Sequence, residues 1–211
     1  MAVTRAGRAL LMAALAACAP AGRAAVAQAS AGDAALLPAG YGSLKRDDIA
    51  ITVQVQGLTI RAIPLDESVI RALAPDSYNS LRALRDSKTA EVDRVRLRLG
   101  LPSLQLWHLS YFNVQQGEAR YDPRDVQIRS AGRDFRPLEV IALVPGFGDG
   151  RLAQARSVDA IFLFDPAVVL SQPLVVTLSG QTSSAWNDEV LHKLDLERAA
   201  IWSRAAAARK P

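Results

Sequence analysis

The side chains best suited to catalysis or metal binding are scarce in this sequence. Its 211 residues include one cysteine, Cys18, and two histidines, His108 and His192. Neither histidine has a second ligand at the spacing of a zinc site, and no H-E-x-x-H motif occurs. His108 alternates with apolar neighbours, which is typical of a histidine satisfied inside a core strand, whereas His192 falls on an exposed helix position. We therefore expect no metal and no cofactor.

Carboxylates are the other groups that could do chemistry. Two of them brought together could act as general acid and base, or could bind calcium. Aspartates are also common in turns because they hydrogen-bond the local backbone, and this second interpretation is the one we favour. The aspartates in question lie at turns or just before the first strand: Asp47, Asp48, Asp122, Asp125 and Asp134.

The glycine-rich stretch 146–150 resembles a phosphate loop only in its glycine content. A phosphate loop opens a helix, whereas Arg151 and Leu152 lead back toward a strand. We interpret the stretch as a hairpin loop with Phe147 as a candidate binding contact. The sequence also lacks the G-x-S-x-G turn of an α/β-hydrolase.

The first 17 residues have the three parts of an export signal. Arg5 and Arg8 give a positive start, residues 9–15 form an apolar run too short to span a membrane, and small residues follow. Leu15-Ala16-Ala17-Cys18 then resembles the lipobox of bacterial lipoproteins. That resemblance covers about 18 residues and implies that Cys18 is acylated and becomes the first residue of the mature protein.

The lipobox resemblance also implies a location. Acyl chains on Cys18 would hold the protein at a membrane facing the periplasm, and Ala19 after the cysteine implies the outer membrane in a two-membrane host. An alternative stays open: cleavage by ordinary signal peptidase after Ala27 or Ala29, which both end A-x-A patterns. Residues 18–45, rich in alanine, glycine and serine, read as a flexible tether.

Charge argues against nucleic-acid binding. The net charge is +4, from 25 basic and 21 acidic residues that are interleaved without forming a basic stripe.

Residues 46–183 predict a mainly β domain, an antiparallel immunoglobulin-like sandwich. Apolar residues alternate from Ile49 to Val55 before a turn at Gln56-Gly57, and residues 104–114 are apolar on both faces like a central strand. Alternation of Val95, Leu97 and Leu99 with arginines predicts another strand. Further strands are expected at residues 126–129, 138–143, 157–164 and 174–178.

Helices are expected at two places. Asp66 can cap a short helical insertion at about residues 64–90, and Asn187 can cap an amphipathic helix within residues 184–211. The apolar stripe of this second helix, which includes Trp202, could pack on its own domain, dock on a partner or lie on a membrane. Packing is the default, and a partner interface comes next.

These features favour a lipid-anchored, noncatalytic envelope protein. Such a protein would act as a binding or structural module for another envelope protein or for cell-wall material, with Phe147 and Trp202 as contacts. The alternative is a small envelope hydrolase or carbohydrate-acting domain that uses the turn carboxylates.

Overall fold

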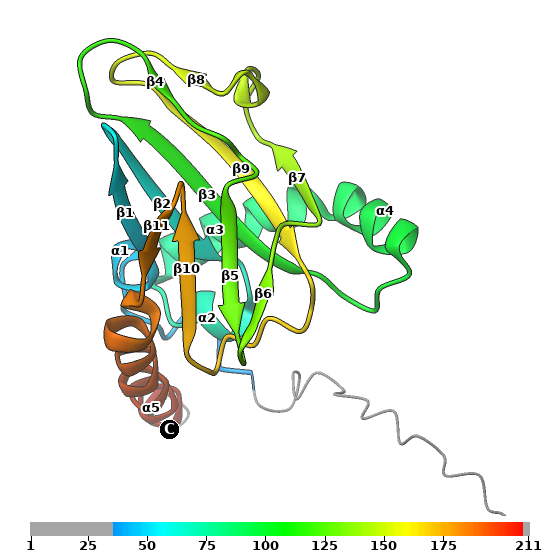
Figure 1. The fold of residues 1–211 in the computed structure, drawn as a ribbon. Coiled ribbons are helices and arrows are strands. Elements are labelled where there is room, and N and C mark those ends of the chain that lie inside the picture. The colour runs from blue at the N-terminus through cyan, green and yellow to red at the C-terminus, as the bar shows by residue number, and fades with distance from the viewer. Residues whose placement is uncertain (1–35, 209–211) are drawn as a thin grey trace, which may run out of the picture.

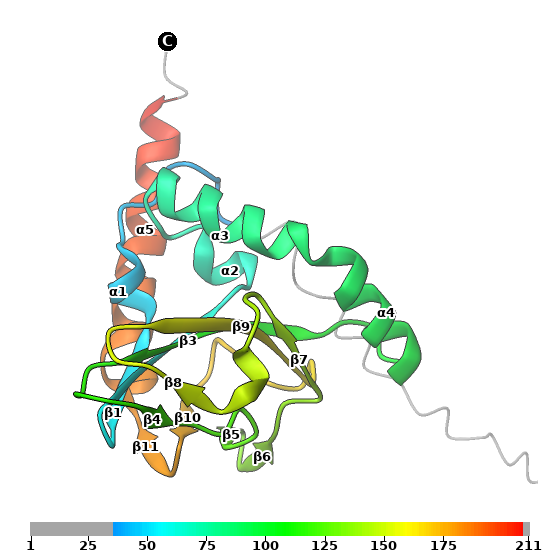
Figure 2. The same ribbon diagram turned by 90° about the horizontal axis from the view of Figure 1, so that it is seen from above.

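The computed structural model describes residues 36–208, which form a mixed α and β domain. Of these described residues, 34% are helical and 32% lie in strands, so the expectation of a mainly β domain is corrected. All strands pair antiparallel, as expected. Figures 1 and 2 show three layers: a layer of helices, a five-stranded sheet and a four-stranded sheet.

The five-stranded sheet has the order β1-β2-β3-β9-β7. The predicted hairpin at Gln56-Gly57 is confirmed, and both turn residues have positive φ, 46° and 79°. The predicted central strand is also confirmed, because β3 pairs with β2 on one side and β9 on the other. The strands are β1 (Ile51–Val55), β2 (Leu58–Pro64), β3 (Gln105–Asn113), β9 (Ser157–Phe164) and β7 (Glu139–Ala142).

The four-stranded sheet has the order β11-β10-β5-β6. Its strands are β11 (Gln181–Ser183), β10 (Leu174–Leu178), β5 (Val126–Ser130) and β6 (Arg133–Phe135). A separate two-stranded ribbon pairs β4 (Ala119–Arg120) with β8 (Arg151–Leu152). The short 3-10 helix η1 (Phe147–Asp149) lies just before β8 in the chain.

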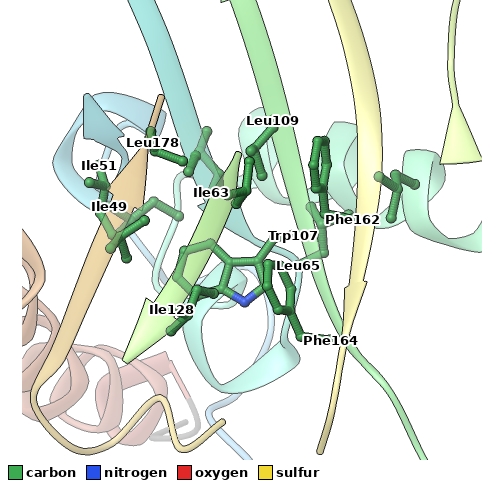
Figure 3. Packing of buried hydrophobic residues seen from close by; sticks show 14 of the residues in the cluster. Ile49, Ile51, Ile63, Leu65, Trp107, Leu109, Ile128, Phe162, Phe164 and Leu178 are labelled. Carbon is green, nitrogen blue, oxygen red and sulfur yellow. The ribbon is translucent and has the colours of Figure 1, made fainter. Parts of the chain in front are cut away.

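The hydrophobic core lies between the two sheets because each strand turns alternate apolar residues inward. Trp107, Leu109 and Tyr111 of β3 are at most 1% exposed. Trp107 sits at the centre of this core in Figure 3, with its ring 6.4 Å from that of Phe164 and 6.0 Å from that of Trp186. Aromatic pairs at such distances stabilise a core beyond the area that they bury.

Three helices lie over the outer face of the five-stranded sheet (Figure 2): α2 (Glu67–Ile70), α3 (Pro75–Ser87) and α4 (Thr89–Leu99). The expected cap is confirmed, since the Asp66 carboxylate accepts from the backbone N–H of Ser68 at 2.8 Å. The strand expected around Val95 is wrong, because this stretch is α4. Val95 is buried, whereas Leu97 is 69% exposed, so the alternation does not mark a sheet face.

The C-terminal helix packs against its own domain. It begins as a π-helical turn, η2 (Trp186–Val190), and continues as α5 (Leu191–Ala208). Leu194 and Ile201 are fully buried, which confirms the default interpretation. Asn187 does not cap the helix. It lies within the π-helical turn, and its side-chain oxygen accepts from the N–H of Leu174 at 2.6 Å.

The packed domain begins before residue 46, the boundary expected from composition. Leu37 is 5% exposed, and its carbonyl accepts from Arg71 at 2.9 Å. Leu44 forms a parallel bridge with Leu73, beside the point where Gly42 meets the backbone of Ala72. The segment 37–45 is therefore part of the fold. Cys18 and the earlier part of the tether lie outside the described residues.

Candidate functional site

The turn aspartates of the hydrolase alternative make separate contacts. Asp122 accepts from the backbone N–H of Arg124 at 2.8 Å, and Asp134 pairs with Arg129 at 2.7 Å. Asp48 accepts from the backbone N–H of Lys45, which is the largest cause of its lowered pKa. The hydrogen bond from Arg129 likewise lowers the pKa of Asp134. A general acid needs the opposite shift, because it must hold its proton near neutral pH.

The remaining two aspartates also make local contacts. Asp47 pairs with Arg61 at 3.1 Å, and Asp125 bonds through its backbone, with its N–H donating to the carbonyl of Asp122. These contacts stabilise local structure and do not form an acid–base pair.

His108 has a partner that sequence reasoning missed. Its Nε2 lies 3.3 Å from the carboxylate of Asp159 on β9, and the two side chains are 14% and 30% exposed. Hydrogen bonds from His108 and from the Ser110 hydroxyl lower the pKa of Asp159, although burial opposes this. The pairing register explains why His108 and Asp159 are close. Ser110 on β3 stands opposite Asp159 on β9, and His108 lies two residues before Ser110 on the same face of β3. No local motif signals this pair, because its members come from strands far apart in the sequence.

This serine, histidine and aspartate set does not have the arrangement of a hydrolase triad. In a triad the histidine lies between the other two and takes the serine proton. Here the carboxylate is the group that His108 and Ser110 both approach, so the histidine does not lie between the other two. These three side chains therefore satisfy one another's polar atoms on the helix-covered face of the sheet. This agrees with the expectation that His108 is a satisfied histidine, and its partner is Asp159.

Phe147 is a core residue and not a surface contact. It is 3% exposed, and its ring lies 5.7 Å from that of Tyr121 and 6.2 Å from that of Phe162. The Tyr121 hydroxyl donates to the carbonyl of Phe147 and fixes the loop. The glycine loop thus turns its aromatic side chain inward, and the expected binding role of Phe147 is corrected.

Trp202 is the one exposed tryptophan of the three in the sequence. It is 48% exposed on α5, whereas Trp107 and Trp186 are fully buried. One turn earlier, Arg198 pairs with Asp195 at 2.8 Å and reaches the carbonyl of Ser68 at 3.3 Å. These contacts hold the flank of α5 that carries Trp202 against α2.

A shallow groove of about 520 Å³ lies along β6 and the segment 136–138 that follows it. Its lining includes Arg133, Phe135, Arg136, Leu138 and Asp165. The Arg133 guanidinium lies over the Phe135 ring, 5.2 Å from its centre. Sequence reasoning did not single out this groove, because its lining brings β5, β6 and the turn after β9 together.

Within residues 36–208, no three histidine, cysteine, aspartate or glutamate side chains gather closely enough to hold a metal ion. No helix in the same range is both long and apolar enough to cross a bilayer.

Comparison with known proteins adds little. No protein-family model matches the chain, and no curated protein matches it. A crystal structure of a functionally unknown protein from Listeria monocytogenes EGD-e has a TM-score of 0.32 at 10% identity, over 60% of this chain and 68% of that one. A similarity at that level carries no argument about fold or function.

Proposed function

We propose that this protein is a lipid-anchored, noncatalytic module of the cell envelope that binds another envelope protein through the exposed flank of α5. The observation that carries the proposal is Trp202, which is 48% exposed on a helix whose other face is docked in the core. Tryptophan and arginine are the residue types most enriched among the side chains that dominate protein–protein binding. Trp202 is one of these types, and Arg198 one turn earlier holds the helix beneath it through Asp195 and the carbonyl of Ser68.

The rigidity of α5 supports this role. Its buried face is fixed by Leu194 and Ile201, so Trp202 is presented in one orientation without a large entropic cost of ordering on binding. A partner pocket that receives an indole ring would complement this flank.

Anchoring rests on the lipobox at Cys18. Acylation there would keep the domain at a membrane surface, with the partner in the same envelope compartment.

The alternative of a hydrolase has less support. Four turn aspartates engage arginines or backbone amides one by one: Asp47, Asp48, Asp122 and Asp134. These contacts lower the pKa of Asp48 and of Asp134. At the level of fold, the two antiparallel sheets support an immunoglobulin-like sandwich. The placement of β1, β2 and β3 side by side in one sheet differs from the order of constant-type immunoglobulin domains, where the third strand joins the opposite sheet.

Site-specific photocrosslinking in the native host tests the partner surface. A photoreactive phenylalanine analogue at position 202 of the full chain should give a discrete adduct with an envelope protein. The same analogue at position 196 is the matched control, because Leu196 is 62% exposed on the same helix. Deletion of residues 186–211 is a poorer test, since it removes Trp186 and Leu194 from the core. Absence of an adduct at position 202, or equal adducts at both positions, would count against the proposal.

A further inference from the structure

The C-terminal end of α4 carries the most exposed large apolar side chain of residues 36–208. Leu97 is 69% exposed, and Leu99, on the other side of Arg98, is 41% exposed. The helix packs on the domain through Val92 and Val95 instead, so neither leucine is needed to hold it in place. Figure 2 shows α4 running out past β7, so that its end lies at the margin of the domain.

The charges of α4 are divided along its length. The acidic residues Glu91 and Asp93 lie in its first half, whereas residues 94–99 contain three arginines and no acid. Two of these arginines pair with Asp93 and Glu139, so three positive charges against two negative ones leave the helix end at +1. Helices that lie in a membrane interface likewise combine exposed leucine with arginine or lysine, which attracts anionic headgroups.

The other exposed apolar side chains have different surroundings. Three arginines lie within three positions of Leu97, and no other exposed large apolar residue of the described range has as many basic neighbours. Leu196 of α5 is 62% exposed, but Asp195 and Glu197 stand on either side of it, and an anionic surface disfavours them. Leu97 is therefore the exposed apolar side chain best matched to an anionic lipid surface.

The proposed anchor would keep such a surface within reach. Nineteen residue steps separate Cys18 from Leu37, and their composition predicts a flexible tether with its ends about 25 Å apart. A domain of this size has a radius of gyration of about 16 Å, so it is wider than that tether is long. Leu37 is bonded to Arg71 at the end of α2, in the helix layer that also contains α4 (Figure 2). At the high local concentration that a tether provides, a weak contact is enough to orient the domain.

We propose that the end of α4 rests on the lipid surface to which the protein is anchored. Leu97 enters the boundary between headgroups and acyl chains, and Arg94, exposed one turn earlier on the same face, meets the lipid phosphates. This inference rests on the proposed lipid anchor and adds an orientation to it. The helix layer faces the membrane, and the four-stranded sheet faces away.

Quenching of tryptophan fluorescence by brominated lipid tests this orientation. The full chain, made in its host and purified in detergent, is reconstituted into vesicles of equal parts brominated phosphatidylcholine and phosphatidylglycerol, and its attachment is checked by flotation. In the variant Leu97→Trp, bromine should quench the emission of the added tryptophan. The unsubstituted chain should show no such loss, because Trp107 and Trp186 are buried and Trp202 lies on α5.

The matched control is Leu196→Trp, because tryptophan itself prefers a membrane interface and this position is similarly exposed. It should not be quenched, and quenching at position 97 should weaken when the phosphatidylglycerol is omitted. Flotation without quenching at position 97, equal quenching at position 196 or in the unsubstituted chain, or quenching that is as strong without anionic lipid would overturn the orientation and leave the anchor in place. A chain that does not float would remove both.

Discussion

Ser43 and Glu197 lie 154 residues apart in the chain, and the backbone N–H and the hydroxyl of Ser43 both donate to the same oxygen of Glu197, at 2.8 and 3.0 Å. Arg204 donates to that oxygen at 2.7 Å and also reaches the carbonyl of Tyr41 at 2.6 Å. Glu197 is 7% exposed within an otherwise apolar helix face. This polar contact joins the N-terminal segment to α5.

Replacement of Glu197 should destabilise the domain in a pH-dependent way. Burial alone would raise the pKa of Glu197, but hydrogen bonds from Arg204 and Ser43 outweigh it and hold the pKa below its usual value. The contact therefore stabilises the fold above the pKa of an unfolded glutamate, and this contribution is lost as pH falls through the folded pKa. Glu197→Gln should lower the free energy of unfolding at pH 7 by about 1–2 kcal/mol.

Urea denaturation across a pH series measures this effect. The difference between the variant and the unsubstituted protein should shrink toward acidic pH, while Glu189→Gln, at an exposed position, should have little effect at any pH. A difference that does not change with pH would contradict the charged contact.

Substitution of Gly42 should destabilise the fold because of close backbone packing. A Cβ added there would lie 2.4 Å from both the carbonyl carbon of Ala72 and the carbonyl oxygen of Leu73. Gly42→Ala should therefore cost about 1–3 kcal/mol, as overpacking does elsewhere. Gly148→Ala is the control, since a Cβ there meets nothing within 4 Å. Equal melting temperatures for the two variants would show that the segment can shift away.

Phe147→Ala tests whether this residue belongs to the core. Loss of a buried phenylalanine should reduce the free energy of unfolding by about 3–5 kcal/mol. Phe112→Ala removes a ring that is 41% exposed and should cost much less. If thermal denaturation gave similar melting temperatures for the two variants, the buried placement of Phe147 would be wrong.

Asp159→Asn tests the pairing of β3 and β9 side chains. Because the hydrogen bond from His108 lowers the pKa of Asp159, the carboxylate contributes stability above its unfolded pKa and loses it as pH falls. The variant should be less stable by about 1 kcal/mol at pH 7 and should approach the unsubstituted protein at low pH. Guanidinium denaturation at both pH values gives the comparison, and an unchanged midpoint at pH 7 would rule the contribution out.

Cys18→Ser tests the anchor. Without the thiol no acyl chain can be attached, so the protein should leave the membrane fraction or accumulate with its signal uncleaved. Fractionation and intact mass of the protein from its host decide the matter. If both were unchanged, cleavage near Ala27 or Ala29 would replace the lipobox interpretation.

Local apolar patterns were sufficient to predict most strands. Apolar residues alternate in β1 and cover both faces of β3, and the predicted runs also match β5, β7, β9 and β10. Alternation misled around Val95, because Val92, Val95 and Leu99 also fit helical spacing. Gly100, with φ of 65°, closes that helix at its C-terminal end.

Contacts that depend on tertiary structure could not be predicted. Asp159 meets His108, and Glu197 meets Ser43, only after strands and helices far apart in sequence have packed. The inward position of Phe147 has the same origin, since its neighbours Tyr121 and Phe162 come from distant segments. Trp202 was expected within the apolar stripe of its helix, but it is 48% exposed, whereas Leu194 and Ile201 of that stripe are fully buried.

The position of Leu44 has a mechanical consequence. Its N–H donates to the carbonyl of Ala72 at 3.1 Å, and its carbonyl accepts from the N–H of Ala74 at 2.9 Å. The hydrogen bond from Arg204 to the carbonyl of Tyr41 fixes the same segment. Tension applied to the chain ahead of Leu37 therefore meets these bonds before it reaches β1. A pull from the N-terminal side would peel this segment away from α2 and α5 while both sheets remained intact.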